Sequence, residues 1–436
     1  MSLTPLPLPR LKRLAKEGSW IVVGQIASVT ASLVLVRMLT EHLEPTQYGQ
    51  LALALTLGTL VCQVAFSGAM PGIMRYYAIA AEKGEASEYF VAARRMMLYG
   101  TSVALGLSAV LLLGLPLFGK VDLLGLTAIT IIFSVLGSYN STQSMIQNAA
   151  RQRQVIALHG CLDAWLKIFF AVGLLTWLGN SAKVVVIGYI ASLLLVLGSQ
   201  AIFIRRLIPR KPTQADKPNP WMGQIWLYSK PFVFFNFSTW IQASSDRWAL
   251  DTFATTQDVG LYAVLIQLGY SPISMVAGLM TALIGPILFQ RSGDTTDHSR
   301  NTGVHRRAWQ LTFIALFFTL LACLLAYGLH DWIFRLLVAA QYRSVSYLLP
   351  WMILAGGLFS AGQVLSLKLM SDLNTKALMW PKIITSIVGA LLSFAGAYRM
   401  GLNGVVYAAV AFAALQFVWL GLLSMHPLGG QDKGWA

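Results

Sequence analysis

Long apolar runs constrain this chain more than any other feature of its sequence. A helix needs roughly 20 mostly apolar residues to cross the ~30 Å hydrocarbon core of a bilayer. Runs of that length follow one another along the whole chain, and the segments between them are short. We therefore predict an all-α polytopic membrane protein with twelve transmembrane helices, at residues 18–40, 48–78, 91–118, 121–147, 155–178, 182–204, 226–253, 259–289, 308–330, 345–370, 377–398 and 402–425.

The composition agrees with this prediction and excludes two other classes. Charged residues make up 11% of the chain and apolar residues 56%, whereas a soluble domain carries about 25% charged residues. A water-soluble enzyme is therefore excluded, and the apolar content excludes an intrinsically disordered chain. The three cysteines, Cys62, Cys161 and Cys323, each lie inside an apolar run, so no disulfide framework or paired-cysteine metal site is indicated.

The basic residues are distributed unevenly between the two sides of the predicted bundle. Of the 32 Lys and Arg residues, 24 fall on the side of the N-terminus and the even-numbered connections, and six on the other. Cytoplasmic connections of membrane proteins collect Lys and Arg. We therefore expect both termini in the cytoplasm and a multi-pass protein of the plasma membrane.

The chain divides into two halves of six predicted helices each. A Pro-rich, charged stretch separates them and is typical of a linker. The expected parts are a basic cytoplasmic lead-in (1–17), a first lobe (18–204), the cytoplasmic linker (205–225), a second lobe (226–426) and a cytoplasmic tail (427–436).

The two halves show a weak internal repeat at an offset of about 210 residues. The offset aligns Arg37 with Arg247 and, after one inserted residue, Gly49 with Gly260. Six helices per half give both copies the same orientation in the membrane. Transporters built from such repeats often bind their substrate between the repeats, near the bilayer midplane.

Charged residues inside predicted helices mark the candidate site. A Lys or Arg at a helix centre costs about 2.5–3.5 kcal/mol on the insertion scale, so it normally faces the bundle interior. Cations outnumber acids there, and such a cavity favours an anion such as phosphate. The candidate substrate-binding residues are Arg37, Arg247, Lys167, Arg75, Lys230, Lys368, Gln242 and Asn236, and the candidates for ion coupling or charge pairing are Asp246 and Asp163.

Structural explanations remain open for these residues. Arg37, Lys230 and Lys368 lie near helix ends, where a long cation reaches the interface without binding anything. Asp163 and Lys167 are four residues apart and can form a structural ion pair. Asp246 and Arg247 can instead join neighbouring helices.

The sequence contains no complete enzyme motif. The stretch GLPLFGKV at 114–121 nearly matches a phosphate-binding loop, but Val121 replaces the required Ser or Thr. The six histidines are scattered, and no nucleophile–base pairing is visible. We therefore predict no catalytic residue, no metal site, no cofactor and no nucleic-acid partner.

Several segments resemble the polysaccharide-flippase family, O-antigen type, of the multidrug/oligosaccharidyl-lipid/polysaccharide flippase superfamily. The opening LAKEGSWIVVGQIASVTASLVLVRMLTEHLEPTQYGQLALAL is similar to the family's start. The segments FSGAMPGIMRYYA and QNAARQRQVIALHGCLDAWLKI resemble its second helix and its turn into the fifth. An Asp-Arg pair before the VGLYA turn at 259–263 resembles the start of its second half. The resemblance covers about the first 290 residues.

The resemblance implies a function as well as a fold. It implies a MATE-like, two-lobed transporter in which six helices per lobe surround a central cavity. It also implies alternating access that moves a polyprenyl-diphosphate-linked oligosaccharide from the cytoplasmic to the periplasmic leaflet of the bacterial inner membrane, for O-antigen, lipopolysaccharide, capsule or exopolysaccharide assembly. Expected partners are this glycan lipid, the bilayer, and polysaccharide polymerase and chain-length machinery. Energy would come from a proton or sodium gradient or from consumption of the product.

Three alternatives stay open. A multidrug and toxin extrusion antiporter exports organic cations and needs an uncompensated acid, but residues 18–40 contain none. A peptidoglycan-precursor flippase usually has fourteen helices. A membrane glycan polymerase, which is an enzyme, needs a substantial outer loop, but the longest predicted one, at about 331–344, is short.

Overall fold

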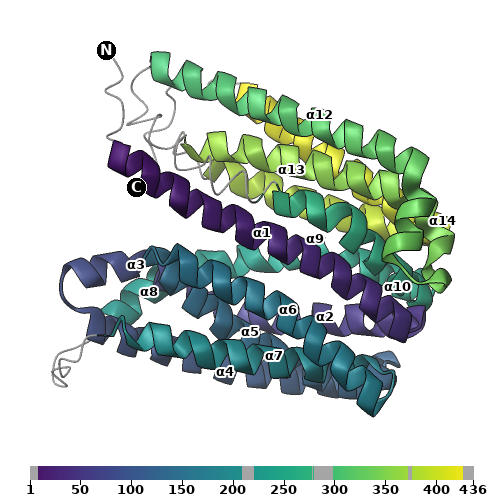
Figure 1. The fold of residues 1–436 in the computed structure, drawn as a ribbon, viewed down its shortest axis with the longest axis horizontal. Helices are drawn as coiled ribbons and strands as arrows, with labels where there is room; N and C mark the ends of the chain where they lie inside the picture. Colours follow the sequence, from purple (N-terminus) through teal and green to yellow (C-terminus); the bar gives the residue numbers. More distant parts are fainter. Residues whose placement is uncertain (1–7, 209–219, 277, 279–297, 372–375, 426–436) are drawn as a thin grey trace.

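Helices are the regular elements throughout the part of the chain that the structure describes (Figure 1). The structure is a computed structural model and describes residues 8–208, 220–276, 278, 298–371 and 376–425. The main helices are α1 (Leu8–His42), α2 (Pro45–Phe66), α3 (Met70–Glu82), α4 (Ala86–Gly114), α5 (Leu124–Ala149), α6 (Arg153–Leu178), α7 (Ala182–Arg205), α8 (Trp221–Ser229), α9 (Pro231–Phe253), α10 (Thr256–Leu265), α12 (His298–Leu337), α13 (Leu349–Ser371) and α14 (Lys376–Met425). Short 3-10 segments η1 (Leu115–Phe118), η2 (Val121–Leu123) and η4 (Ala340–Leu348) and a π-helical turn η3 (Ile266–Tyr270) connect or extend them.

Ten helical segments of the described chain are long and apolar enough to cross a membrane. One of them, Trp380–Met425, is two helices that meet at Gly401, whose φ of 56° interrupts α14. α9 is outside this set because it carries Asp246, Arg247 and other polar residues. With the interrupted pair counted as two and α9 added, each predicted span has a helical counterpart. The chain is a multi-pass membrane protein.

Two predicted spans are not single helices, and the sequence prediction was wrong there. The span 48–78 divides at residues 67–69 into α2 and α3, and the span 226–253 divides at Lys230 into α8 and α9. Each second piece has a proline, Pro71 or Pro231, in its first turn. Proline lacks the backbone N–H that would continue the preceding helix, so it favours a new start. The predicted span 259–289 continues beyond residue 278 outside the described residues.

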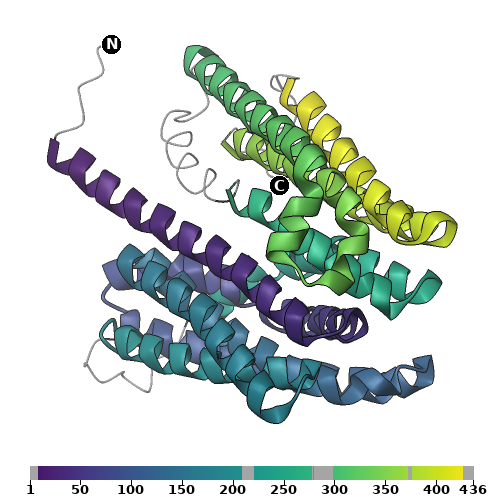
Figure 2. The same ribbon diagram turned by 45° about the vertical axis from the view of Figure 1, so that its right-hand side comes forward.

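The helices form two groups with α1 between them. In Figures 1 and 2, α3–α8 lie on one side of α1, and α9, α10, α12, α13 and α14 lie on the other. We call the end of the bundle that holds the turns at 83–85 and 150–152 the basic end, and the end that holds the turns at 43–44 and 254–255 the opposite end. In Figure 1 the basic end is on the left.

The largest buried apolar cluster joins the two groups. It contains Leu53 of α2, Val264 and Leu265 of α10 and Leu348 of η4, all with no exposed surface. Large apolar side chains also cover the outside of the bundle; Phe169 is 70% exposed and Leu324 is 71% exposed. Such an exterior suits contact with hydrocarbon rather than water.

The short helix α8 attaches the start of the second half to the first half. It packs against α3 and α4 at the basic end. The backbone N–H of Gly72 donates to the Ser229 hydroxyl at 2.8 Å, and a Cβ on Gly72 would meet the Ile225 carbonyl oxygen at 2.6 Å. The glycine therefore allows the two backbones to approach closely. The last residues of the predicted linker 205–225 begin this helix.

Candidate functional site

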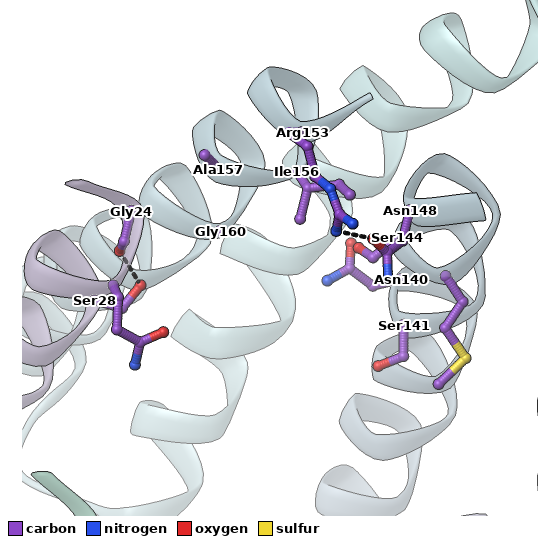
Figure 3. Close-up of a pocket in the computed structure, with 12 residues that line it drawn as sticks. Gly24, Ser28, Asn140, Ser141, Ser144, Asn148, Arg153, Ile156, Ala157 and Gly160 are labelled. Atoms are coloured by element: carbon purple, nitrogen blue, oxygen red, sulfur yellow. Dashed lines mark hydrogen bonds between the residues drawn. The ribbon is translucent and has the colours of Figure 1, made fainter. Parts of the chain in front are cut away.

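A cavity of about 500 Å³ lies between α1, α5 and α6 at the basic end (Figure 3). Binding cavities of proteins have volumes of this order. We call this cavity the crevice. Three elements supply its lining, which consists of Gly24, Gln25, Ser28, Asn140, Ser141, Ser144, Met145, Asn148, Arg153, Ile156, Ala157 and Gly160.

Polar side chains reach the crevice mainly from one face of α5. Asn140, Ser144 and Asn148 are spaced four residues apart and therefore share that face. The Oδ1 atom of Asn140 is buried and has no hydrogen-bond partner among the described residues. A buried polar atom without a partner costs free energy, so this oxygen is available to accept a hydrogen bond from a ligand hydroxyl or from water. The crevice is thus suited to a ligand rich in hydroxyl groups.

Small residues keep the crevice open on its other two sides. A Cβ on Gly24 of α1 would lie 3.3 Å from the Ala157 Cβ of α6, so these two helices pack closely there. Gly160 of α6 has open space where a side chain would be. The hydroxyl of Ser28 donates back to the Gly24 carbonyl at 2.8 Å. The helices therefore meet tightly at one level and leave room beside it.

Arg153 is the charged residue of the crevice lining. It begins α6, directly after the turn 150–152, in which Arg151 adopts a positive φ of 59°. The Arg153 guanidinium donates to Asn148 Oδ1 across the turn between α5 and α6, and Figure 3 shows the two side chains meeting. The side chain is half-buried. Its remaining N–H groups place a fork of donors at the basic end of the crevice.

The predicted pair Asp163–Lys167 lies deeper along the same helix. The Nζ of Lys167 is 2.6 Å from Asp163 Oδ2, and it lies 5.5 Å above the ring of Phe133 of α5. The exposed fractions of the two side chains are 23% and 20%. Fourteen residues separate Arg153 from Lys167, about 21 Å at 1.5 Å per residue. α6 therefore carries one cation at its start and another near its middle.

The two halves approach most closely through the repeat-related glycines. A Cβ on Gly49 would overlap the carbonyl oxygen of Thr256, and a Cβ on Gly260 would overlap the carbonyl oxygen of Pro45. Each glycine thus contacts the residue four positions before its counterpart. The contact is symmetric, as expected for two copies of one ancestral unit. It lies at the opposite end, where α2 and α10 begin.

Arg37 belongs to a second set of contacts at the opposite end. Its Nη1 donates to the Val338 carbonyl at 2.8 Å, and its Nη2 lies 2.6 Å from Glu41 Oε1. The Gln341 amide donates to the Leu43 carbonyl at 2.9 Å, and the Tyr342 hydroxyl donates to the same oxygen at 2.8 Å. These contacts attach the end of α1 to the connection after α12.

Asp246 and Arg247 lie on α9, the polar helix of the second half. The Asp246 carboxylate accepts hydrogen bonds from the Arg247 backbone N–H, at 2.8 Å, and from the Tyr262 hydroxyl of α10. The guanidinium of Arg247 donates to the Ala243 carbonyl at 3.4 Å and interacts electrostatically with Tyr48 of α2. Its Nε is buried without a partner in the described part of the chain. The structure therefore brings Arg37 and Arg247 to the same seam between the halves.

The remaining predicted site residues are dispersed. Arg75 on α3 and Lys230 at the junction of α8 and α9 are exposed. The Gln242 Oε1 accepts a hydrogen bond from the Ser386 hydroxyl of α14 at 3.3 Å, and Asn236 is half-buried on α9. The side chain of Lys368 lies outside the described residues.

Sequence reasoning missed three charged residues that the structure singles out. Arg153 is not among the predicted site residues, although the polar residues of α5 beside it could have pointed to it. Lys120 forms an ion pair with Asp251 of the other half at 2.6 Å. Lys382 of α14 lies 4.1 Å above the ring of Phe235. No cluster of His, Cys, Asp or Glu suited to a metal ion occurs among the described residues.

The fold is similar to that of known membrane transporters. The lipid II flippase MurJ in an inward closed conformation has a TM-score of 0.70 and 14% identity, over 94% of this chain and 87% of that one. An inward-facing MATE-family multidrug resistance transporter of the MOP superfamily has a TM-score of 0.59 and 16% identity, over 94% of each chain. A MATE transporter of Vibrio cholerae has a TM-score of 0.54 and 13% identity, over 95% of each chain.

Sequence comparison identifies the family. No curated protein sequence matches the chain. A family described as "Polysaccharide biosynthesis protein" matches residues 14–291, which is more than half of the chain. The similar folds confirm the predicted two-lobed, MATE-like fold class. The chain therefore belongs to the polysaccharide biosynthesis protein family.

Proposed function

We propose that this protein is a flippase for a polyprenyl-diphosphate-linked oligosaccharide, which it moves from the cytoplasmic to the periplasmic leaflet for O-antigen, capsule or exopolysaccharide assembly. One observation carries the proposal: the crevice combines a hydroxyl-matching lining with a cation at its mouth and another deeper along α6. Sugars present hydroxyl groups, and a diphosphate presents anionic oxygens that Arg and Lys bind by charge-assisted hydrogen bonds.

The distribution of charge supports the orientation. The basic end holds most of the Lys and Arg residues, and cytoplasmic surfaces of membrane proteins are enriched in them. The crevice then opens toward the leaflet in which a lipid-linked glycan is made. Sugars would enter the crevice first, and Arg153 would meet the diphosphate at the membrane surface.

The contacts at the opposite end support alternating access. The glycine contact of α2 with α10 and the hydrogen bonds of Arg37 and Tyr342 join the halves at that end. Such a state holds the substrate path shut toward the periplasm while the crevice is accessible from the cytoplasm. Transport then requires these contacts to separate.

The energy source of this transport cycle is part of the proposal. Asp163 and Asp246 are half-buried acids within the membrane, and such residues in transporters often carry protons. We propose a proton or sodium gradient, with Asp163 or Asp246 as its carrier. The product would pass to a polysaccharide polymerase and its chain-length partner. The protein acts in this scheme as a transporter and catalyses no bond change.

The test is the Arg153→Ala variant in a strain that lacks the chromosomal copy. Loss of a charged hydrogen-bond partner costs about 1.5–3 kcal/mol, so we expect glycan export to fall about ten- to hundredfold at normal protein level. Arg153→Lys should restore part of the export. The matched control is Arg151→Asn, which removes an exposed charge from the same turn and tolerates its positive φ.

The deletion strain itself tests the wider assignment. Lipid-linked glycan should accumulate on the cytoplasmic leaflet when the protein is absent. Normal surface polysaccharide in that strain, or wild-type export by Arg153→Ala, would overturn the proposal.

A further inference from the structure

A second cavity, of about 630 Å³, lies between α2, α4 and α9. Its walls are almost wholly apolar: aliphatic side chains from α2 and α4 on one side, and Phe237, Trp240 and Trp248 of α9 on the other. Because α2 and α4 belong to the first half and α9 to the second, the cavity lies on the seam between the halves. We call it the seam groove.

The two tryptophans present only carbon to the groove. The Trp240 indole N–H donates to the Thr56 backbone carbonyl at 2.8 Å, and the Trp248 indole N–H donates to the Thr56 hydroxyl at 2.9 Å. A single residue of α2 thus fixes both rings and satisfies both donors. Indole rings held in this way form a rigid apolar wall.

The groove is open to the side of the bundle. Its rim residues Val110 and Phe118 are 71% and 81% exposed, and Phe237 is 43% exposed. In a membrane, exposed apolar residues at these positions face lipid. A chain can therefore enter from the bilayer without passing through the protein.

The length of the groove matches the depth of one leaflet. From Trp248 to Phe237 along α9 is eleven residues, about 16 Å at 1.5 Å per residue. That distance is about half of the ~30 Å hydrocarbon core. A chain suspended from the membrane surface at the opposite end would reach the bilayer centre within the groove.

One charged residue lines the groove, and it lies at the opposite end. Lys120 is 34% exposed, and its Nζ is 2.6 Å from Asp251 Oδ2 at the end of α9. Asp251 itself is 2% exposed and accepts a hydrogen bond from the Thr256 hydroxyl. An occupant with a phosphate above an apolar chain would place its anion at Lys120.

We propose that the seam groove holds the polyprenyl chain of the translocated substrate, with the diphosphate at Lys120. The inference rests on the proposed function and adds the site that the product occupies on the periplasmic side. The arriving diphosphate competes with Asp251 for Lys120. Because that ion pair joins the two halves, its exchange weakens the closed opposite end when the product is present. One cation at the end of one apolar wall matches a single chain that carries its anion at one end, as the proposed substrate does.

Photolabelling tests the site directly. The probe is a polyprenyl diphosphate with a photoreactive group in its chain, added to the full-length protein in nanodiscs. We expect the label on α4 and α9 peptides that line the groove, and competition by unlabelled polyprenyl diphosphate. Equal competition by phosphatidylglycerol would show that the groove holds bulk lipid and would overturn the inference.

Two sets of variants sharpen the test. Val110→Trp fills the groove and should abolish groove labelling, whereas Val103→Trp, on an exposed part of the same helix outside the groove, should leave it unchanged. Lys120→Gln should remove the advantage of unlabelled polyprenyl diphosphate over polyprenol as a competitor, and Asp251→Asn should retain that advantage. Labelling of Val110→Trp at the wild-type level would contradict the assignment.

Failure of this inference is distinct from failure of the proposed function. If the wild-type protein exports the glycan while the label maps elsewhere, only the groove assignment is lost. If the deletion strain shows no accumulated lipid-linked glycan, the proposed function is lost, whatever the labelling shows.

Discussion

At the scale of single residues, Asp163 and Lys167 can have one of two roles. They form either a binding site for the diphosphate or a purely structural ion pair, and variants of the two residues distinguish these roles. Both roles are compatible with a 2.6 Å contact between half-buried groups. If Lys167 binds the diphosphate, Asp163→Asn leaves the cation in place and frees it from its partner, so binding persists. We expect Lys167→Met to abolish the thermal stabilisation of the purified protein by polyprenyl diphosphate, and Asp163→Asn to keep it.

A purely structural pair gives a different pattern. Removing either partner leaves the other charge half-buried and uncompensated, so both variants would lose stability without ligand to a similar extent. The unliganded melting temperature of each variant is therefore the control. Equal loss of ligand response in both variants would contradict a binding role for Lys167.

The contacts and roles of single residues could be predicted only in part from the sequence. The adjacency of Asp163 and Lys167 followed from their spacing on one helix, and the structure shows that contact. The roles of Arg153 and Asn140 did not, because the crevice forms only where α1, α5 and α6 meet. The unpartnered oxygen of Asn140 is visible only in three dimensions.

At the scale of elements, the contact between α2 and α10 depends on two glycines. Alanine normally stabilises a helix by up to about 1 kcal/mol relative to glycine. At Gly49 and Gly260, however, a Cβ overlaps a backbone carbonyl of the facing helix, and backbone cannot move aside as a flexible side chain can. We expect Gly49→Ala and Gly260→Ala to open the seam at the opposite end and to reduce glycan export.

Solvent access measures that opening. A cysteine at Gln341, beside the end of α1, should react faster with a membrane-impermeant thiol reagent in either glycine variant than in the parent. The matched control is Gly137→Ala on α5, where a Cβ meets nothing within 4 Å. Unchanged reactivity in both seam variants would show that the helices accommodate the methyl group.

The positions of the helices were the feature of this fold that the sequence predicted best. Apolar runs located the helices, because a bilayer requires every backbone group of a span to be satisfied within its own helix. The repeat offset also aligned Gly49 with Gly260, which lie in contact in the structure. The breaks before α3 and α9 escaped prediction, because the apolar runs continue through them and only Pro71 and Pro231 mark the change.

At the scale of the whole molecule, the cycle requires the two halves to separate at the opposite end. The side chain of Gln341 reaches the end of α1 next to Glu44, and both residues are exposed. These two positions belong to different halves of the protein. A cysteine is placed at each of them in a background in which Cys62, Cys161 and Cys323 are replaced. A short bifunctional methanethiosulfonate reagent should therefore cross-link the halves in their closed arrangement.

We expect cross-linked Glu44→Cys/Gln341→Cys to export no lipid-linked glycan, and export to return when a reductant cleaves the linker. Each single variant with the same reagent is the control, since it carries the modification without the bridge. A rigid channel would transport equally well with the two halves joined, because its path does not depend on their separation. Full export by the bridged protein would therefore contradict alternating access, whereas reversible arrest makes separation of the halves an obligatory step.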